Sequence, residues 1–435
     1  MLERIERYFE FARLRTDWRT EILAGCTTFA TMAYIIFVNP SILADAGMPV
    51  ESVTAATCLT AGLASILMGA AGRYPLALAP GMGLNAYFAY VVVQKMQVPW
   101  QTALGAVFLS GAAFLALTLC GFRQKLLRAL PRELTASVAA GIGLFIAFVG
   151  LRNAGIIVAD PATMVTLGDL TAPNATLAMA GIVAMAALAA RRFQGAILAG
   201  IGLTFAAGLA TGAFTWAPKP YQWPSVAGTA LQLDVSGALR LGLAEIVFVF
   251  LFVDLFDNLG TTVAVTRHAG LMEPDGRIPR VGSILAIDAA ATMAGALVGT
   301  STVVSYIESA AGIAAGGRSG VTAVVTGVLF LAAMILAPLA GTIPGAATAP
   351  ALVLVGAAML GHIAAIDWNQ PRVAIPAFLT IAAIPLTFSI ANGLALGFTA
   401  YCLIQLLSGH GREVSALMYG LCALFLVRFL YLGAG

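Results

Sequence analysis

Three carboxylic acids lie in stretches of the chain that are otherwise apolar. Asp254 and Asp257 belong to the run EIVFVFLFVDLFDNLG, and Glu308 belongs to GTSTVVSYIESAAGIAAGGRSG. Because Asp254 and Asp257 are three positions apart, they share one face of a helix. Acids inside membrane-type segments are costly and mark substrate or proton pathways by default. Burial and mutual repulsion disfavour ionisation, so we expect at least one of the three to be protonated near neutral pH.

Such a set of acids suits a neutral, flat, hydrogen-bonding solute that is carried together with H⁺. A carboxylate accepts hydrogen bonds from ring N–H groups, and a carboxylic acid also donates one. Aromatic side chains in the same segments could stack on a ring, although we expect ordinary packing for most of them. These aromatic residues are Tyr87, Phe88, Phe252, Phe256 and Tyr306.

Two further acids fall within apolar segments. Glu245 lies nearer the outer end of its predicted span, and Asp288 has no polar neighbours in the sequence. Their direct involvement therefore stays open at this point.

The segment around Glu308 is not built like a regular membrane helix. Gly299–Gly320 is crowded with Gly, Ser and Thr, although apolar runs flank it. Backbone at membrane depth can be non-helical only where protein or a wet cavity surrounds it. We expect an extended piece at Thr300–Ser305 and a half-helix that begins near Tyr306 or Glu308. The alternative role for Glu308 is a structural acid paired with an arginine or a backbone amide.

The first half of the chain has a counterpart in Leu76–Phe88, which reads LALAPGMGLNAYF. Pro80 removes a backbone donor, and Gly81 and Gly83 permit extended or positive-φ backbone, so the helix should break here. Asn85 follows directly and is a candidate solute contact. Its alternative role is to cap the second part of the broken span.

Composition places these segments in a membrane. Of 435 residues, 60% are hydrophobic and 10% are charged, whereas soluble domains carry about 25% charged residues. No basic stripe indicates a nucleic-acid partner. We expect no disulfide framework, no metal site and no cofactor, because the cysteines form no CxxC pair and the histidines have no ligand spacing. These residues are Cys26, Cys58, Cys120, Cys402 and Cys422, and His268, His362 and His410.

Apolar stretches long enough for a span, or shorter where a helix is broken, predict about fourteen membrane spans. The first seven fall near 21–42, 53–72, 76–96, 102–121, 135–154, 176–190 and 195–216. The second seven fall near 240–265, 282–298, 300–317, 320–338, 346–362, 374–390 and 393–408. A last apolar piece, Leu417–Leu432, is either interfacial or a fifteenth span.

The spans divide the chain into five parts, and charge orients them. We expect an amphipathic segment at 1–20, a first repeat at 21–217, an outer linker at 218–238, a second repeat at 239–409 and a C-terminal apolar segment at 410–435. Arg and Lys gather in alternate loops, which predicts a cytoplasmic N-terminus. The first 20 residues are rich in arginine without an apolar core, so they do not resemble a cleaved signal. We therefore expect a multi-pass protein of the cytoplasmic (inner) membrane.

The two halves of the chain repeat each other weakly. MGAAGRYPLALAPGMG (Met68–Gly83) is similar to MAGALVGTSTVVSYIE (Met293–Glu308), LPRELTAS to IPGAATAP, and FQGAILAG to IANGLALG, in the same order. Seven spans per half is an odd number, so the second half must enter the membrane upside down. This is the inverted-repeat plan of secondary transporters, whose sites form where interrupted spans of the two halves meet.

Three motifs together resemble the AzgA-like purine permeases, a branch of the nucleobase–cation symporter 2 family. They are APGMGLNAYF, FVDLFDNLGT and TSTVVSYIESAAGIAAGGRSGVTAVV. The resemblance implies an all-α 7+7 inverted repeat whose third and tenth spans are discontinuous. It implies a core domain of spans 1–4 and 8–11 and a gate domain of spans 5–7 and 12–14. It also implies uptake of adenine, guanine or hypoxanthine with protons, an elevator-type movement and a homodimer.

The resemblance also implies roles for the acids. Glu308 matches the acid at the start of the tenth span that binds the base, and Asp257 matches the acid across the site. Asp254 matches a second acid that tunes binding or proton coupling, and all three are candidates to carry the proton. Asn258 stands where Thr is more usual in the family. Since it lies beside Asp257, it can alter the hydrogen bonding of that acid and leaves purine selectivity open.

The remaining predicted site residues come from the two interrupted spans. Asn85 matches the polar residue of the third span, and Gly83 offers backbone contacts beside it. Ser309, which follows Glu308, completes the set.

Other solutes and other protein classes are alternatives to purine transport. The same fold could carry uracil, a xanthine-like base or an anion, but an anion carrier is expected to supply a buried base or free half-helix ends rather than Glu308. Intramembrane aspartyl proteolysis needs paired aspartates on two spans, whereas Asp254 and Asp257 share one. A retinal protein needs a lysine in mid-membrane, and none is placed there. We therefore do not expect an enzyme.

Overall fold

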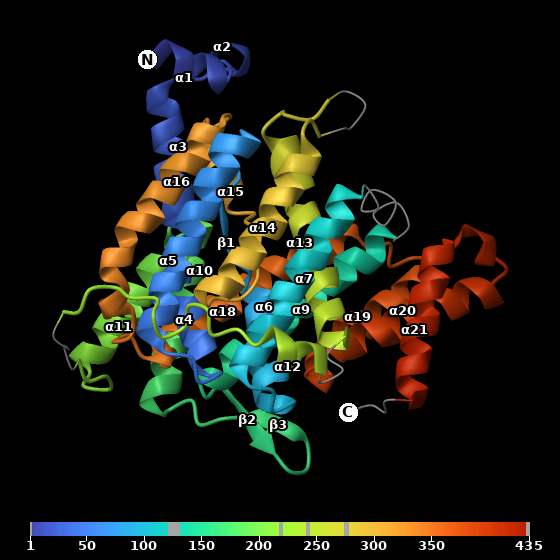
Figure 1. The fold of residues 1–435 in the computed structure, drawn as a ribbon. Helices are drawn as coiled ribbons and strands as arrows, with labels where there is room; N and C mark the ends of the chain where they lie inside the picture. The colour runs from blue at the N-terminus through green and yellow to red at the C-terminus, as the bar shows by residue number, and fades with distance from the viewer. Residues whose placement is uncertain (1, 121–130, 217–220, 241–243, 274–277, 432–435) are drawn as a thin grey trace. The chain divides into compact units, whose positions relative to one another are not determined.

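The computed structural model describes residues 2–120, 131–216, 221–240, 244–273 and 278–431 (Figure 1). In this part of the chain, ten helical segments are long and apolar enough to cross a membrane. They are Trp18–Ala44, Val50–Gly72, Trp100–Leu119, Arg132–Asn153, Pro173–Ala190, Glu245–His268, Val281–Val298, Gly320–Leu339, Gly345–Ala365 and Ile390–Leu407. Two shorter apolar helices fall at the predicted seventh and thirteenth spans. The predicted third and tenth spans are interrupted, so the predicted fold class is confirmed.

The helices and strands follow one another along the two predicted halves of the chain. The first half contains α1 (Leu2–Tyr8), α2 (Phe11–Leu14), α3 (Trp18–Met32), α4 (Ile35–Ala44), α5 (Val50–Leu67), η1 (Met68–Gly72), β1 (Leu78–Pro80), α6 (Met82–Ala86), η2 (Tyr87–Lys95), α7 (Trp100–Leu119), α9 (Arg132–Asn153), β2 (Ile157–Asp160), β3 (Met164–Leu167), α10 (Pro173–Ala190) and α11 (Ala196–Ala210). The second half contains α12 (Val235–Arg240), α13 (Ala244–His268), α14 (Val281–Val298), β4 (Val303–Ser305), α15 (Ser309–Ala314), α16 (Gly320–Ala333), η3 (Met334–Leu336), α17 (Ala337–Ala340), α18 (Gly345–Leu360), η4 (Gly361–Ala365), α19 (Pro371–Thr387), α20 (Ile390–Leu407), η5 (Gly411–Glu413) and α21 (Ala416–Tyr431).

The two interrupted spans meet in a short antiparallel ribbon. β1 of the third span pairs with β4 of the tenth, and the register joins Leu78 to Ser305, Ala79 to Val304 and Pro80 to Val303. Aligned without a gap, the similar strings Met68–Gly83 and Met293–Glu308 place Ala79 on Val304. The centre of the ribbon therefore joins equivalent positions of the two repeats, as a two-fold inverted repeat requires.

Two details differ from the sequence prediction. The strand covers Val303–Ser305 rather than all of Thr300–Ser305, and the half-helix α15 begins at Ser309 with Glu308 as its N-cap. A hairpin, β2–β3, follows α9 and was not predicted. In its turn, backbone N–H groups of Thr163 and Ala162 donate to Asp160, which holds the pKa of that carboxyl below its ordinary value.

Glycines bring α16 into close contact with α5 and with η1, which continues it. A Cβ on Gly320 would lie 2.0 Å from the carbonyl oxygen of Gly69, and a Cβ on Gly327 would lie 2.5 Å from that of Gly62. The glycines are seven residues apart on each helix, so both pairs lie on one face. Small residues permit such approach between membrane helices, where van der Waals packing drives association.

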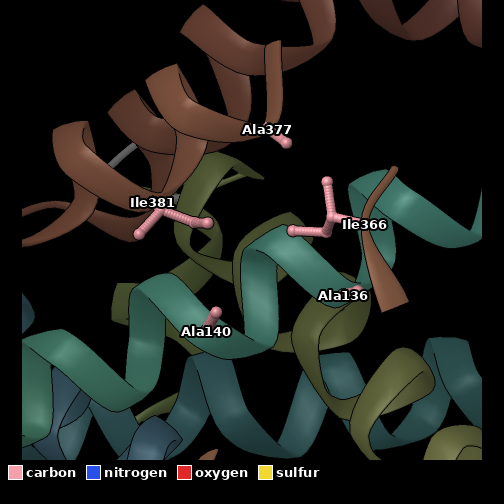
Figure 2. Close-up of a cluster of buried hydrophobic side chains, with 5 residues drawn as sticks. All are labelled: Ala136, Ala140, Ile366, Ala377 and Ile381. Atoms are coloured by element: carbon pink, nitrogen blue, oxygen red, sulfur yellow. The ribbon is translucent and has the colours of Figure 1, made fainter. Parts of the chain in front are cut away.

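Contacts divide the chain into two compact units. The first comprises Met1–Ala116 and Asn153–Ala351, and the second comprises Leu117–Arg152 and Leu352–Gly435. Within the second unit, α9 and α19 bury a shared cluster that Figure 2 shows in close-up. Its members are Ala136, Ala140, Ile366, Ala377 and Ile381. Both interrupted spans belong to the first unit.

Parts of the predicted domain plan fall on residues that the structure does not describe. Residues 218–220 of the predicted linker and 432–435 of the predicted C-terminal segment lie outside the described residues. The rest of the linker packs on the first unit, where Leu231 N donates to Leu297 O at 2.7 Å. α21 accounts for the leftover apolar piece, and whether it spans a membrane stays a prediction.

The Gly327→Ala variant tests the close helix pair. The new methyl group would meet backbone atoms of Gly62 and Ile66, so α5 and α16 must separate, at a cost of about 1–3 kcal/mol in the free energy of unfolding. The matched control is Gly202→Ala in α11, where a Cβ meets nothing within 4 Å. Thermal unfolding in detergent should show a lower midpoint for the first variant and an equal or higher one for the control. Equal midpoints for both would contradict the packing.

Candidate functional site

The ribbon edges that β1 and β4 leave unpaired are satisfied by side chains. Ser65 Oγ accepts from Leu78 N at 2.9 Å and donates to Leu78 O at 3.1 Å. Thr292 Oγ1 likewise accepts from Val303 N at 3.2 Å and donates to Val303 O at 2.9 Å. The two repeats thus use the same device, a hydroxyl from the preceding span. It removes the cost of unpaired backbone groups at membrane depth.

Further backbone bonds extend the ribbon at both ends. Gly81 N donates to Thr302 O and Tyr306 N donates to Ala77 O, each at 2.9 Å. Ser309 Oγ accepts from Ala77 N at 3.0 Å. The hydroxyl of Ser309, predicted as a solute contact, is therefore engaged with the backbone of the third span.

Glu308 lies where β4 gives way to α15. It is the N-cap residue of that helix, its side chain is partly exposed, and its Oε1 accepts from the Tyr34 hydroxyl at 2.9 Å. The preceding residue, Ile307, is 51% exposed. This end of α15 is therefore not fully enclosed within its unit. No arginine pairs with Glu308 among the salt bridges of the described residues.

Asp257 belongs to the same site. Its side chain is partly exposed, and its carboxyl interacts electrostatically with both Glu308 and Tyr306. Residues 51 positions apart in the sequence are thus brought together. Two partly exposed acids can accept hydrogen bonds from a solute, and either one donates when protonated.

Asp254 lies behind β4 instead. It is fully buried, its Oδ1 accepts from Asn258 Nδ2 at 2.7 Å, and its Oδ2 lies 3.3 Å from Thr292 Oγ1. Asn258 Oδ1 in turn accepts from Ser305 N at 2.7 Å. Asn258 therefore links Asp254 to the strand, whereas sequence reasoning considered its effect on Asp257.

Asp288 has a polar partner after all. It is fully buried, and its Oδ1 accepts from Ser305 Oγ at 2.9 Å. The partner comes from the strand and not from the helix of Asp288, so no neighbour in the sequence indicates it. Glu245 lies in the first turn of α13, nine residues before Asp254 and roughly 14 Å away along the helix axis.

Asn85 is fully buried within α6, whose N-cap is Gly81, so its alternative role as a helix cap is wrong. Its Nδ2 donates to Asn39 Oδ1, and Asn39 Nδ2 donates to Thr57 Oγ1 at 2.7 Å and Thr300 Oγ1 at 3.1 Å. The amide of Asn39 thus joins four segments. Asn85 Oδ1 has no hydrogen-bond partner among the described residues.

Gly83, by contrast, lies partly exposed in the first part of α6. Of the two residues predicted from the third span, Asn85 is therefore buried and Gly83 is partly exposed.

The aromatic residues pack against the protein. Tyr87 meets Phe250 edge to face at 5.2 Å, Phe252 meets Phe248 at 5.6 Å, and the Tyr306 hydroxyl donates to Pro80 O. The Phe256 side chain lies outside the described residues. Tyr34 and Asn39 are the polar residues near the site that sequence reasoning missed. Both lie in the run GCTTFATMAYIIFVNP (Gly25–Pro40).

The Thr292→Val variant tests the hydroxyl that closes the β4 edge. The replacement keeps the shape but leaves Val303 N and O unpaired, so the free energy of unfolding should fall by about 1–3 kcal/mol. The control is Thr211→Val at the exposed end of α11, where the hydroxyl donates to Ala207 O. Thermal unfolding of both purified variants measures the difference. A midpoint equal to that of the control would show that the hydroxyl does not hold the strand.

Known proteins resemble this chain along nearly its full length. A family model described as "Permease family" (Xan_ur_permease) matches residues 19–396. A Methanocaldococcus jannaschii protein described as a permease is 50% identical over 429 residues, which cover 98% of each chain. The adenine permease AdeP of Escherichia coli is 42% identical over 430 residues, 99% of this chain and 97% of the relative. The guanine/hypoxanthine permease PbuG of Bacillus subtilis is 43% identical over 447 residues, 98% and 100% of the two chains.

A solved structure shares the fold. The transmembrane domain of a cyanobacterium bicarbonate transporter, BicA, matches with a TM-score of 0.65 and 18% identity, covering 87% of this chain and 96% of that one. At this identity the likeness concerns the fold alone. The family match and the relatives make the protein a membrane transporter and not an enzyme. Together with the interrupted spans, they establish that the chain belongs to the Permease family, in the AzgA-like branch of the nucleobase–cation symporter 2 transporters.

Proposed function

We propose that this protein imports purine nucleobases, namely adenine, guanine or hypoxanthine, together with protons across the cytoplasmic membrane. The observation that carries the proposal is the pairing of Glu308 and Asp257 at one accessible site beside the β1–β4 ribbon. Purines are neutral, flat and edged with N–H donors and ring acceptors, which two acids and free backbone groups can match. The names of relatives more than 40% identical over almost the whole chain support the same substrate class.

The geometry suggests how the acids divide the work. Glu308 and Asp257 are partly exposed and bind the base, while Gly83 offers backbone contacts. Asp254 is enclosed and hydrogen-bonded through Asn258 to the backbone that leads into Glu308. In this proposal all three acids are candidates for the transported proton, and Asp254 acts on binding through the strand. Asn85 and Ser309 hold the two interrupted spans in place.

The larger movement follows the fold. We propose an elevator-type mechanism in which a core of spans 1–4 and 8–11 moves against a gate of spans 5–7 and 12–14, in a homodimer whose N-termini are cytoplasmic. The interrupted spans and the residues of the proposed site all fall in one compact unit, as a moving core requires. Contacts group α10 and α11 with this unit, so their place in the gate stays a prediction.

Another neutral base, such as uracil or xanthine, would use the same groups. An anion is favoured less, because a carboxyl pair that forms no arginine salt bridge in the described part of the chain repels it.

Uptake measurements test the substrate and the coupling. Cells that lack their own purine permeases and express this protein should accumulate radiolabelled adenine, guanine or hypoxanthine, and a protonophore should abolish the accumulation. Unlabelled uracil and xanthine serve as competitors to rank the alternative bases. Failure to take up any of the three purines would overturn the substrate assignment, and uptake indifferent to the protonophore would overturn the coupling.

The Glu308→Gln variant tests the principal binding residue. Loss of a hydrogen bond to a charged group costs about 1.5–3 kcal/mol, so the affinity for the preferred purine should fall roughly 10- to 100-fold. Tyr34→Phe removes only the partner of Glu308 and should have a smaller effect. Binding to purified protein measures both variants, with the exposed Glu3→Gln as the control. Near-normal affinity of Glu308→Gln would contradict the role.

A further inference from the structure

A cavity lies in the first unit, and none of its lining residues belongs to the site described above. It has a volume of about 50 Å³ and lies between α2, the turn after η1 and the turn before α14. Its charged lining residues are Glu10, Arg13, Arg73 and Arg280, so three arginines and one glutamate give it a net charge of +2. Nothing in the proposed transport mechanism uses this charge.

The three arginines converge on a single carboxylate. Arg73 Nη1 lies 3.6 Å and Arg280 Nη2 lies 3.4 Å from the same oxygen, Oε1 of Glu10, while Arg13 Nε pairs with Oε2. Each guanidinium has five N–H donors, so one carboxylate cannot use them all. Arg73 Nε is buried and has no hydrogen-bond partner among the described residues. Donors for a second anion therefore remain around the cavity.

The arginines are held in place by their surroundings. The guanidinium of Arg73 lies 4.1 Å from the ring centre of Tyr8, whose hydroxyl donates to Ala70 O at 2.6 Å. Glu10, Arg73 and Arg280 all have left-handed backbone, with φ of 60°, 59° and 56°. Such backbone costs non-glycine residues about 1–2 kcal/mol and persists where the surrounding structure fixes it. The basic cavity is therefore preorganised.

The depth of the cavity relative to the membrane follows from the span ends. Arg73 directly follows the span Val50–Gly72, and Arg280 directly precedes the span Val281–Val298. Arg13 lies five residues before the span that begins at Trp18. Residues at the ends of spans lie at the level of lipid headgroups, and basic pockets between membrane helices bind phosphorylated headgroups.

We propose that this cavity binds a phosphate group, and that its source is the headgroup of an anionic phospholipid. The guanidinium groups of Arg73 and Arg280 bind the phosphate oxygens, a pairing that suits the planar guanidinium fork. Glu10 holds the arginines together when the cavity is empty and competes with the phosphate when it is filled. The lipid thereby joins helices α1 and α2 to the ends of two spans, Val50–Gly72 and Val281–Val298.

The test measures thermal unfolding of the purified full-length protein in neutral detergent. Dihexanoyl phosphatidylglycerol, dihexanoyl phosphatidylcholine and inorganic phosphate are titrated at matched ionic strength. Phosphatidylglycerol should raise the unfolding midpoint with a saturable dose response, and phosphatidylcholine should not. Equal responses to the two lipids would overturn the proposal. A response to inorganic phosphate equal to that of phosphatidylglycerol would keep the phosphate site and overturn the lipid as its source.

Variants separate the site from general surface charge. Arg73→Gln with Arg280→Gln should weaken the phosphatidylglycerol response about fivefold for each arginine removed. The control, Arg191→Gln with Arg192→Gln, removes the same charge from the exposed turn between α10 and α11 and should respond like the parent protein. An unchanged response of the first pair, or an equal loss in the control, would overturn the site.

The Glu10→Gln variant keeps the test decisive if the double variant does not fold. Removing the competing carboxylate should tighten phosphatidylglycerol binding several-fold. If Glu10 only held the N-terminal helices in place, its loss would lower the midpoint without tightening the lipid, and that result would overturn the proposal.

Discussion

The structure depends on one constraint, which is that backbone N–H and C=O groups must be paired at membrane depth. Two spans are extended rather than helical at 78–80 and 303–305. Each of these strands is paired with another strand on one edge only. The other sides are closed by Ser65 and Thr292, and Asn258 adds a bond to Ser305 N. Polar side chains are therefore required in neighbouring spans for the sake of the backbone alone.

This constraint also accounts for two layers of acids. Asp254 and Asp288 lie fully buried behind β4, where Asn258 and Ser305 connect them to the strand. Asp257 and Glu308 lie on the accessible side. The position of β4, and with it the start of α15, depends on hydrogen bonds that the buried acids make. A protonation change in the rear layer can thereby reach the residues that we propose bind the base.

Local sequence signals predicted the breaks well. Pro80 and Gly81, and the Ser- and Thr-rich stretch around Glu308, mark backbone that cannot remain a membrane helix, and both breaks are present. The weak match between the two halves did not predict which residues of the two spans face each other, and in the structure Ala79 faces Val304. The bounds were less accurate, because the Gly- and Thr-rich residues before β4 carry no signal for where pairing begins.

Contacts between segments far apart in the sequence could not be predicted from local signals. Tyr34 and Glu308 are 274 residues apart, and a single tyrosine in an apolar run has no pattern that names its partner. Asn39 was missed for the same reason. The bond between Asn258 and Asp254 was not predicted, although their spacing of four places the two side chains on one helix face and could have shown the pair. The β2–β3 hairpin has strands of four residues, too short for a clear alternation.

The most direct measurement of the central claim is an experimental structure of the protein with hypoxanthine bound. We expect the purine ring to lie beside the β1–β4 ribbon, with its N–H groups donating to Glu308 and Asp257 and with Asp254 enclosed behind β4. A ring bound elsewhere in the molecule, with neither Glu308 nor Asp257 in contact with it, would contradict the account.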